Sequence, residues 1–239
     1  MNKVWILAKK ELKTFFDSLL AYILLSLFLG LTGLFTWVLI FDIFSTGQAS
    51  LRPFFWVCFV SFSIFIPAIT MGMFSEEKKS GTIELLLTKS ITDWQVIFGK
   101  LLAVFLLVLT ALAITLPYYI SVVYLGDNVD HGQILTGYLG VILLSLSSIA
   151  VGLWASSISG NQIVALLISL GVAVFLHFVC WLMAFGPIIP GVFDYLSGES
   201  HFEALTNGVV DSKDVIYFLS IFFGGLLLTE AVLSKRRQA

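Results

Sequence analysis

Charged residues are scarce in this sequence. Asp, Glu, Lys and Arg together make up 12% of its 239 residues, which is about half the share found in a typical soluble domain. Hydrophobic residues make up 59%, with 22 phenylalanines among them, and the mean hydropathy is +1.01. This balance argues against a soluble domain and predicts an integral membrane protein. The formal net charge of −2 gives no reason to expect a nucleic-acid partner.

Residues that carry chemistry are equally few. The two cysteines, Cys58 and Cys180, lie inside apolar runs, so we expect them to pack rather than to form a disulfide framework. The sequence contains no Walker A motif, no HExxH or GxSxG motif and no cluster of Cys and His. We therefore expect a chain that is not an enzyme and that itself holds no metal and no cofactor. His177 is the only titratable residue well inside a predicted span, and it is interpreted either as a hydrogen-bonded packing residue or as a proton relay.

Long apolar runs dominate the rest of the chain. A membrane-spanning helix requires about 20 predominantly apolar residues, and six segments meet this requirement. The predicted spans are Leu19–Phe41, Phe54–Phe74, Trp94–Leu125, Ile134–Ala155, Ile163–Phe185 and Val215–Leu233. The sequence thus predicts an all-α membrane protein with a six-helix domain over residues 18–239. Pro67 and Pro117 lack a backbone donor, so each is expected to kink its span.

The lysines and arginines fall mainly on one side of these spans. An even number of spans places both termini on the same side, together with the loop 75–93. Of the 13 basic residues, only Arg52 and Lys213 lie on the other side. Because basic residues gather in cytoplasmic loops, we expect both termini and the 75–93 loop to be cytoplasmic. The segment 186–214 is then expected to lie outside the cell membrane.

The first 17 residues have the pattern of an amphipathic helix. Lys9, Lys10 and Lys13 share one side, and apolar side chains cover most of the remainder. Such a helix is expected to lie flat at the membrane surface, and its lysines interrupt any signal-peptide core, so we interpret it as mature sequence. Glu11 is the exception, because it falls in the middle of the apolar arc. It either extends to water or pairs with a cation on a neighbouring cytoplasmic element.

The densest charge in the chain lies in the loop 75–93. Gly81 is expected to end the helix that leaves the second span. Thr82–Thr88 then predicts a short amphipathic helix, with Gly81 as its N-cap and Glu84 in its first turn, where the helix dipole favours a carboxylate. Its apolar face consists of Ile83, Leu86 and Leu87. This face could lie on the bilayer or dock a cytosolic partner.

Further local signals mark other boundaries. Thr92 and Gln95 predict a capping box that opens the third span. In the outer segment, a short helix is expected to begin with Ser200 as its cap and to end at Asn207–Gly208. The fourth span is rich in glycine and serine, which we interpret either as internal packing or as part of a subunit interface.

The run EEKKSGTIELLLT, residues 76–88, resembles the cytoplasmic signature of type-two ABC transporter permeases. The Lys10–Glu11 pair, the six spans and the long outer segment are similar to that family over the whole chain. Residues 90–95 and the Gly99–Lys100 pair resemble the gliding-motility ABC permeases of Bacteroidetes. The sequence departs from the family in having Ser90 where proline is common, which predicts a less rigid turn after the loop helix.

The resemblance implies specific roles for residues of the loop and of the first helix. In that family the loop helix is a coupling helix that inserts into an ATPase subunit. The residues that the resemblance assigns to ATPase coupling are Glu76, Glu77, Gly81, Thr82, Glu84, Leu85 and Leu86. Those that it assigns to the interfacial helix are Lys9, Lys10, Glu11 and Lys13. Glu76 and Glu77 are expected to pair with basic residues of that helix.

The resemblance also implies partners. ATP and Mg²⁺ would be bound by a separate ABC ATPase subunit, and this chain would be the permease half of an ATP-driven export or mechanotransmission complex. Six spans are half of the family's usual transport unit, so a second copy or a related permease subunit is implied. In the gliding-motility subgroup a membrane protein with a large periplasmic domain is a further partner. Membrane lipids surround the chain, and the expected location is the bacterial inner membrane. The competing interpretation is a non-transporting membrane scaffold that anchors partner subunits.

Overall fold

The structure, a computed structural model, describes residues 3–39, 50–82, 91–126, 129–186 and 190–238. Within these ranges the regular structure is helical and no strand occurs. The helices are α1 (Lys3–Asp17), α2 (Leu19–Leu34), the π-helical turn η1 (Phe35–Leu39), α4 (Arg52–Thr70), α5 (Gly72–Lys79), α7 (Asp93–Ile114), α8 (Leu116–Leu125), α9 (His131–Ile158), α10 (Gln162–Val174), the π-helical turn η2 (Phe175–Val179), α11 (Cys180–Ala184), α12 (Pro190–Leu196), α13 (Gly198–Thr206) and α14 (Ser212–Gln238). The prediction of an all-α protein is confirmed.

Six stretches of helix are long and apolar enough to cross a membrane. They are Ala21–Val38, Arg52–Lys79, Asp93–Tyr124, His131–Ile158, Gln162–Ala184 and Ser212–Arg236. Each contains most of one predicted span, so the number and order of the spans are as the sequence predicts. The second and fourth helices extend beyond the predicted apolar runs, because their polar ends continue the same helices.

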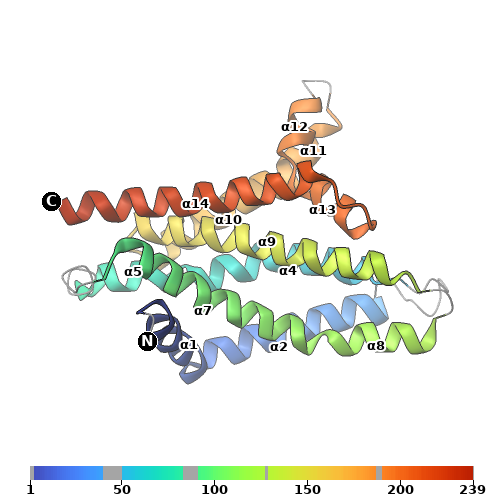
Figure 1. Ribbon diagram of the computed structural model, residues 1–239, viewed down its shortest axis with the longest axis horizontal. Helices are drawn as coiled ribbons and strands as arrows, with labels where there is room; N and C mark the ends of the chain where they lie inside the picture. The colour runs from blue at the N-terminus through green and yellow to red at the C-terminus, as the bar shows by residue number, and fades with distance from the viewer. Residues whose placement is uncertain (1–2, 40–49, 83–90, 127–128, 187–189, 239) are drawn as a thin grey trace.

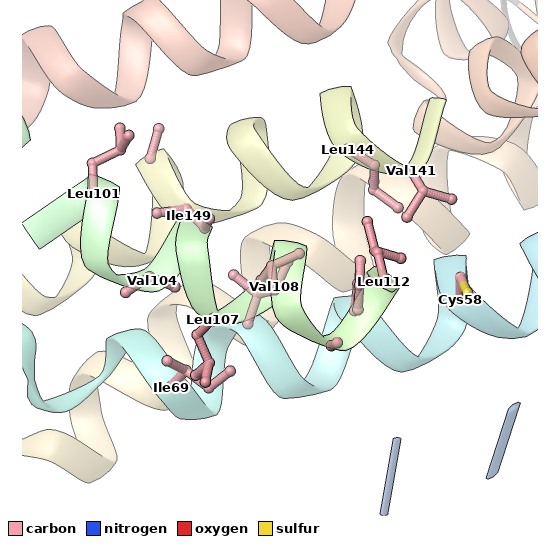
Figure 2. Close-up of a cluster of buried hydrophobic side chains, with 14 of the residues drawn as sticks. Cys58, Ile69, Leu101, Val104, Leu107, Val108, Leu112, Val141, Leu144 and Ile149 are labelled. Carbon is pink, nitrogen blue, oxygen red and sulfur yellow. The ribbon is translucent and has the colours of Figure 1, made fainter. Parts of the chain in front are cut away.

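The second, third and fourth spans form the core of the bundle. Buried residues make up 67% of the most apolar window in the second span, but only 22% in the first and in the last. Figure 2 shows α7 between α4 and α9, with Leu107 near Ile69 of α4 and Leu112 near Val141 and Leu144 of α9. The outer spans expose apolar side chains because their natural solvent is lipid.

The fourth span, α9, is the helix around which the others pack. It contacts α14, α4, α10, α13, α5 and α7. Its glycines permit these approaches: a Cβ at Gly137 would overlap Phe55, and one at Gly152 would overlap Thr70. At Gly225 of α14 a Cβ would lie 2.8 Å from the backbone of Ala150. Internal packing therefore accounts for Gly137 and Gly152 of this span.

The two prolines in the spans lie near interruptions of their helices. Pro117 is the second residue of α8, and α7 ends at Ile114, so the third span is broken at Thr115. Pro67 lies within α4, which gives way to α5 at Met71. Both interruptions agree with the prediction that these prolines disturb the regular helix.

Both chain termini lie at one end of the bundle, together with α5 and the start of α7 (Figure 1). We call this the loop end, because the 83–90 segment connects α5 to α7 there. The opposite end of the long axis carries α8 and the start of α9. An even number of spans requires this arrangement of the termini.

The segment after the fifth span contains α12 and α13. Helix α13 begins one turn earlier than predicted, because Ser197 rather than Ser200 is its cap and accepts from the Ser200 N–H at 3.3 Å. Its end agrees with prediction, with Asn207 as C-cap and Gly208 at φ +89°. His201 ties this helix to α14 through a 2.6 Å contact between its Nδ1 and Asp214 Oδ1.

His177 lies in η2 and is buried. Its Nδ1 is 2.7 Å from Ser63 Oγ of α4, and its ring centroid is 4.8 Å from that of Phe59. A Cβ on Gly198 would lie 2.6 Å from the imidazole, so the start of α13 is packed directly over it. These contacts agree with the packing interpretation of this histidine.

Candidate functional site

Helix α5 has a defined C-terminal end just before the 83–90 segment. Ser80 caps the helix, with its N–H donating to the Glu76 carbonyl at 2.9 Å. Gly81 follows at φ +70°, a conformation that a residue with a Cβ adopts only at a cost. Gly81 therefore ends the helix as predicted, and Thr82 is the last described residue before the segment. Glu84, Leu85 and Leu86, with the rest of the predicted coupling helix, lie outside the described residues.

The start of α7 is fixed by the predicted capping box. Thr92 Oγ1 accepts from the Gln95 N–H at 3.3 Å, and Gln95 Oε1 accepts from the Thr92 N–H at 3.2 Å. One turn further on, the rings of Trp94 and Phe98 stack with centroids 5.7 Å apart. Both limbs of the loop thus have defined ends, one at Gly81 and the other at Thr92.

Lys100 of α7 lies at the centre of a buried ionic cluster. Its side chain is 1% exposed, and its Nζ donates to the Met73 carbonyl at 2.6 Å and to Glu77 Oε1 at 2.8 Å. Glu11 Oε1 of α1 lies 3.5 Å from the same nitrogen, and the Phe74 ring centroid lies 5.1 Å away. A buried ammonium requires such partners, because it has lost its water. We refer to Lys100, Glu77, Glu11 and the Met73 carbonyl as the Lys100 cluster.

The cluster decides between the two interpretations of Glu11. The Glu11 side chain is 12% exposed and contacts Lys100 as well as Lys10, whose Nζ lies 3.6 Å away. It therefore pairs with a cation on a neighbouring element rather than extending to water. That cation comes from the third span, 89 residues later in the chain.

The expected partners of Glu76 and Glu77 are corrected by the structure. Glu77 pairs with Lys100 of α7, not with a lysine of the first helix. Glu76 accepts a hydrogen bond from Gln162 Nε2 at the start of α10. The two carboxylates point to different neighbours because adjacent residues on a helix lie about 100° apart around its axis.

The first helix docks on the third span. Leu7 and Ala8 are buried, and a Cβ at Gly99 of α7 would lie 2.8 Å from Leu7 Cδ2. The absence of a side chain at this glycine lets α1 cross α7 closely. The side chains of Lys9, Lys10 and Lys13 are exposed, as the amphipathic pattern predicts. The placement of this helix on a membrane surface stays a prediction.

A second set of contacts joins α5 to the end of α9. Ser156 Oγ accepts from the backbone N–H groups of Phe74, at 2.9 Å, and Ser75, at 3.2 Å, and donates to the Met71 carbonyl at 3.0 Å. Lys78 Nζ donates to the Ser157 carbonyl. Through these bonds and the Lys100 cluster, α5 is held by α9, α7 and α1 at once.

Sequence reasoning identified Glu11, Glu76 and Glu77 but missed Lys100 as the residue that organises them. Two signals could have found it. Lys100 stands alone in the apolar stretch IFGKLLAVF, and Glu11 stands alone in the apolar arc of its helix. Two opposite charges, each in an apolar setting and both near the same membrane boundary, satisfy each other best by pairing.

The site has no visible place for a metal ion in the part of the chain that the structure describes, where no group of three or more His, Cys, Asp or Glu side chains could hold one. The contacts of the site are structural, because its buried charges and backbone hydrogen bonds hold the helices to one another.

A family model described as ABC-2 family transporter protein matches residues 5–223, from the first turns of α1 into α14. No curated protein matches the chain.

Proposed function

Since the chain belongs to the ABC-2 family of transporter proteins, and is thus a multi-pass permease subunit of an ABC transporter, we propose that its 75–93 loop transmits the conformational changes of a separate ATPase to the membrane spans. Permeases of this family normally act with an ABC ATPase subunit, which binds and hydrolyses ATP. The observation that carries the proposal is the Lys100 cluster, because it joins both limbs of the loop to each other and to α1.

The cluster supports transmission of a force applied to the loop. Helix α5 continues the second span and α7 begins the third, so a load on the intervening segment pulls on both. The 2.8 Å contact between Lys100 and Glu77 opposes separation of α5 from α7, because separating these helices would leave buried charges without a partner. The two limbs therefore move together and take α1 with them through Glu11. Ser156 passes the same displacement to α9.

The docking element in this proposal is the Thr82–Thr88 segment. Its apolar residues Ile83, Leu86 and Leu87 would occupy a groove on the ATPase, which is a common way for a short amphipathic helix to bind. Closure of two ATPase subunits around ATP would draw two such helices together and rearrange the spans. Glu76 and Glu77 act in this scheme at the base of the coupling helix, and Gly81 provides its hinge.

We place the loop end in the cytoplasm, because it carries most of the lysines and arginines. The proposed location is the bacterial inner membrane. The transport unit would be completed by a second copy or a related permease. The likeness of residues 90–100 to gliding-motility permeases favours an export or mechanotransmission complex of that kind, with a third subunit that has a large periplasmic domain.

Affinity purification of the chain from its native membrane tests the coupling proposal. We expect an ABC ATPase to co-purify, and Glu84→Lys to abolish its recovery because the reversed charge opposes the dipole of the loop helix. Asp17→Lys, a matched reversal of an exposed carboxylate on α1, should leave recovery unchanged. If the ATPase is recovered equally with Glu84→Lys, the loop is not its docking element. If partner subunits co-purify without any ATPase, a non-transporting scaffold becomes the better description.

A further inference from the structure

A cavity of about 490 Å³ opens at the loop end between α1, the end of α4 and α5. Its volume falls within the range of roughly 300–1,000 Å³ that is usual for small-molecule sites. The coupling scheme does not require it. Its lining and its position beside an apolar groove indicate the kind of molecule that fits.

The charged lining of the cavity favours a cationic group. Among the described residues it contains the carboxylates of Glu11, Glu76 and Glu77 and the amines of Lys10 and Lys100, so the carboxylates in this part of the lining outnumber the amines by one. Lys100 is buried and already donates to Glu77. Glu11 meets both lysines through Oε1, and its Oε2 takes no part in those two contacts. A bound ammonium would balance the site.

Hydroxyl groups add acceptors for the same ammonium. Thr14 Oγ1 donates to the Lys10 carbonyl at 3.1 Å, and Ser18 Oγ donates to the Phe15 carbonyl at 2.8 Å. Each hydroxyl has thus used its single donor and retains lone pairs. Both line the cavity. A primary ammonium with three N–H donors satisfies carboxylates and hydroxyl oxygens of this kind, whereas a trimethylammonium has no donor to offer.

An apolar groove lies beside the cavity. Ile69 of α4 lines both the cavity and a shallow groove between α2, α4 and α7. The groove runs from Ile69 past Phe65 and Phe62, away from the loop end, and α2 contributes Leu24 and Phe28 to it. Its lining is apolar and lies within the predicted depth of the membrane. A polar cavity beside an apolar groove matches a molecule with a charged head and a hydrocarbon tail.

We propose that the cavity and the groove together bind one phospholipid with a primary amine in its headgroup, of the phosphatidylethanolamine type, from the leaflet at the loop end. Its ammonium lies against Glu11 and Glu76, and its phosphate meets the exposed amine of Lys10. One acyl chain lies along the lipid-facing surface of the groove on α4, because the groove itself encloses only about 20 Å³. A lipid in this position fills the space between α1 and α5 and braces the helices that the Lys100 cluster joins.

The same lining disfavours the other common headgroups. An anionic headgroup such as phosphatidylglycerol would add negative charge to a described lining in which the carboxylates already outnumber the amines. A choline headgroup is usually recognised by a cage of aromatic rings, and the described lining of the cavity offers one ring, that of Phe15. Phosphatidylethanolamine adds no net charge, because its phosphate and its ammonium cancel, and its ammonium supplies the N–H donors that the carboxylates and hydroxyl oxygens can accept.

Lipid retention by the purified full-length chain tests this proposal. The protein is delipidated in mild detergent and incubated with phosphatidylethanolamine, phosphatidylcholine or phosphatidylglycerol of identical acyl chains, and bound lipid is counted by native mass spectrometry. We expect one tightly bound phosphatidylethanolamine, preferred about tenfold over the other two, as the loss of one charge-assisted hydrogen bond would give. Soluble phosphoethanolamine without acyl chains should not displace it, because it cannot use the groove.

Two variants test the two halves of the site separately. Glu76→Gln should remove the headgroup preference, and Leu24→Trp should fill the groove and lower retention of all three lipids. Their matched controls are Asp17→Asn, an exposed carboxylate on α1, and Leu27→Trp, a side chain that is 49% exposed on the same helix as Leu24. Neither control should change retention.

Equal retention of the three lipids overturns the proposal, as does a phosphatidylethanolamine preference that survives Glu76→Gln or a total retention that Leu24→Trp leaves unchanged. Displacement by soluble phosphoethanolamine would mean that the site takes a free headgroup and no acyl chain. Because the assay contains no ATPase, its result is independent of whether the loop docks one.

Discussion

Replacing Lys100 with methionine removes the amine that three helices share while keeping a side chain of similar length. Glu77 loses a partner at 2.8 Å, Glu11 loses one at 3.5 Å, and the Met73 carbonyl loses a donor at 2.6 Å. Lys100 is 1% exposed, and the two carboxylates are 16% and 12% exposed, so water replaces little of what is lost. Each of the two shorter hydrogen bonds is worth about 1.5–3 kcal/mol because it involves a charged group. We therefore expect Lys100→Met to lower the free energy of unfolding by about 3–5 kcal/mol, the range for breaking a buried ion pair.

A double-mutant cycle separates the ion pair from general disruption of packing. Glu77→Gln alone should also destabilise, since it leaves the buried amine with less negative charge around it. When Lys100→Met and Glu77→Gln are combined, the loss should be clearly smaller than the sum of the two single losses, with a coupling energy of about 1–3 kcal/mol. The control is Lys79→Met, which removes an exposed lysine from the end of α5.

Unfolding of the purified chain in mixed detergent micelles, followed by circular dichroism, measures these differences. The same variants can be assayed for ATP hydrolysis stimulated by the permease once the ATPase is in hand. The reasoning is refuted if Lys100→Met unfolds at the same denaturant concentration as Lys79→Met. Strict additivity of Lys100→Met and Glu77→Gln would also refute it, because residues that form one ion pair must be coupled.

Three further predictions concern other parts of the fold. Gly81→Ala should destabilise the chain by about 1 kcal/mol because of the positive φ at this position. Its control, Gly30→Ala in the middle of α2, should be neutral or stabilising. Equal effects of the two substitutions in thermal melts would contradict this reasoning. Ser156→Ala should lower stability by about 2 kcal/mol, since two N–H groups of α5 lose their acceptor, and amide hydrogen exchange should increase at the start of α5 but not in α13. Burial, with a smaller contribution from the charge of Glu203, raises the pKa of Glu199 to about 7 from its usual 4.5. The folded state therefore binds this proton more tightly than the unfolded state. The stability that this proton contributes is fully present below about pH 4.5 and is lost as the pH rises through 7. Glu199→Gln should therefore melt at a higher temperature than the wild type at pH 8, and the difference should shrink at pH 5.

Local signals in the sequence were read correctly where the interaction is itself local. The capping box of Thr92 and Gln95 closes over three residues, and Gly81 ends α5 through its own backbone conformation. Both features depend on atoms that are neighbours in the chain, so they survive any arrangement of the other helices. The order and number of the spans are predictable for a related reason, because each helix satisfies its own backbone groups within the membrane.

The start of α13 shows where local reasoning stops. Ser197 and Ser200 are both suitable caps, and the sequence gives no ground for preferring the earlier one. Tertiary packing decides, because Gly198 packs against the ring of His177, and Ser197 is fully buried. Starting the helix at Ser197 gives it an extra turn in contact with the fifth span.

The sequence by itself determined that lipid is the solvent of this protein, and it determined the six spans, the amphipathic first helix and the ends of the 75–93 loop. Only the tertiary structure decided that Lys100 is the partner of both Glu77 and Glu11, which lie 23 and 89 residues away from it. Composition and periodicity fix which residues must avoid lipid or water, since those preferences belong to each residue alone. The choice of partner depends on which helices pack side by side and at what rotation, and here the close approach of α1 to Gly99 sets it. A buried charge makes pairing necessary, but only the packed helices determine with which residue it pairs.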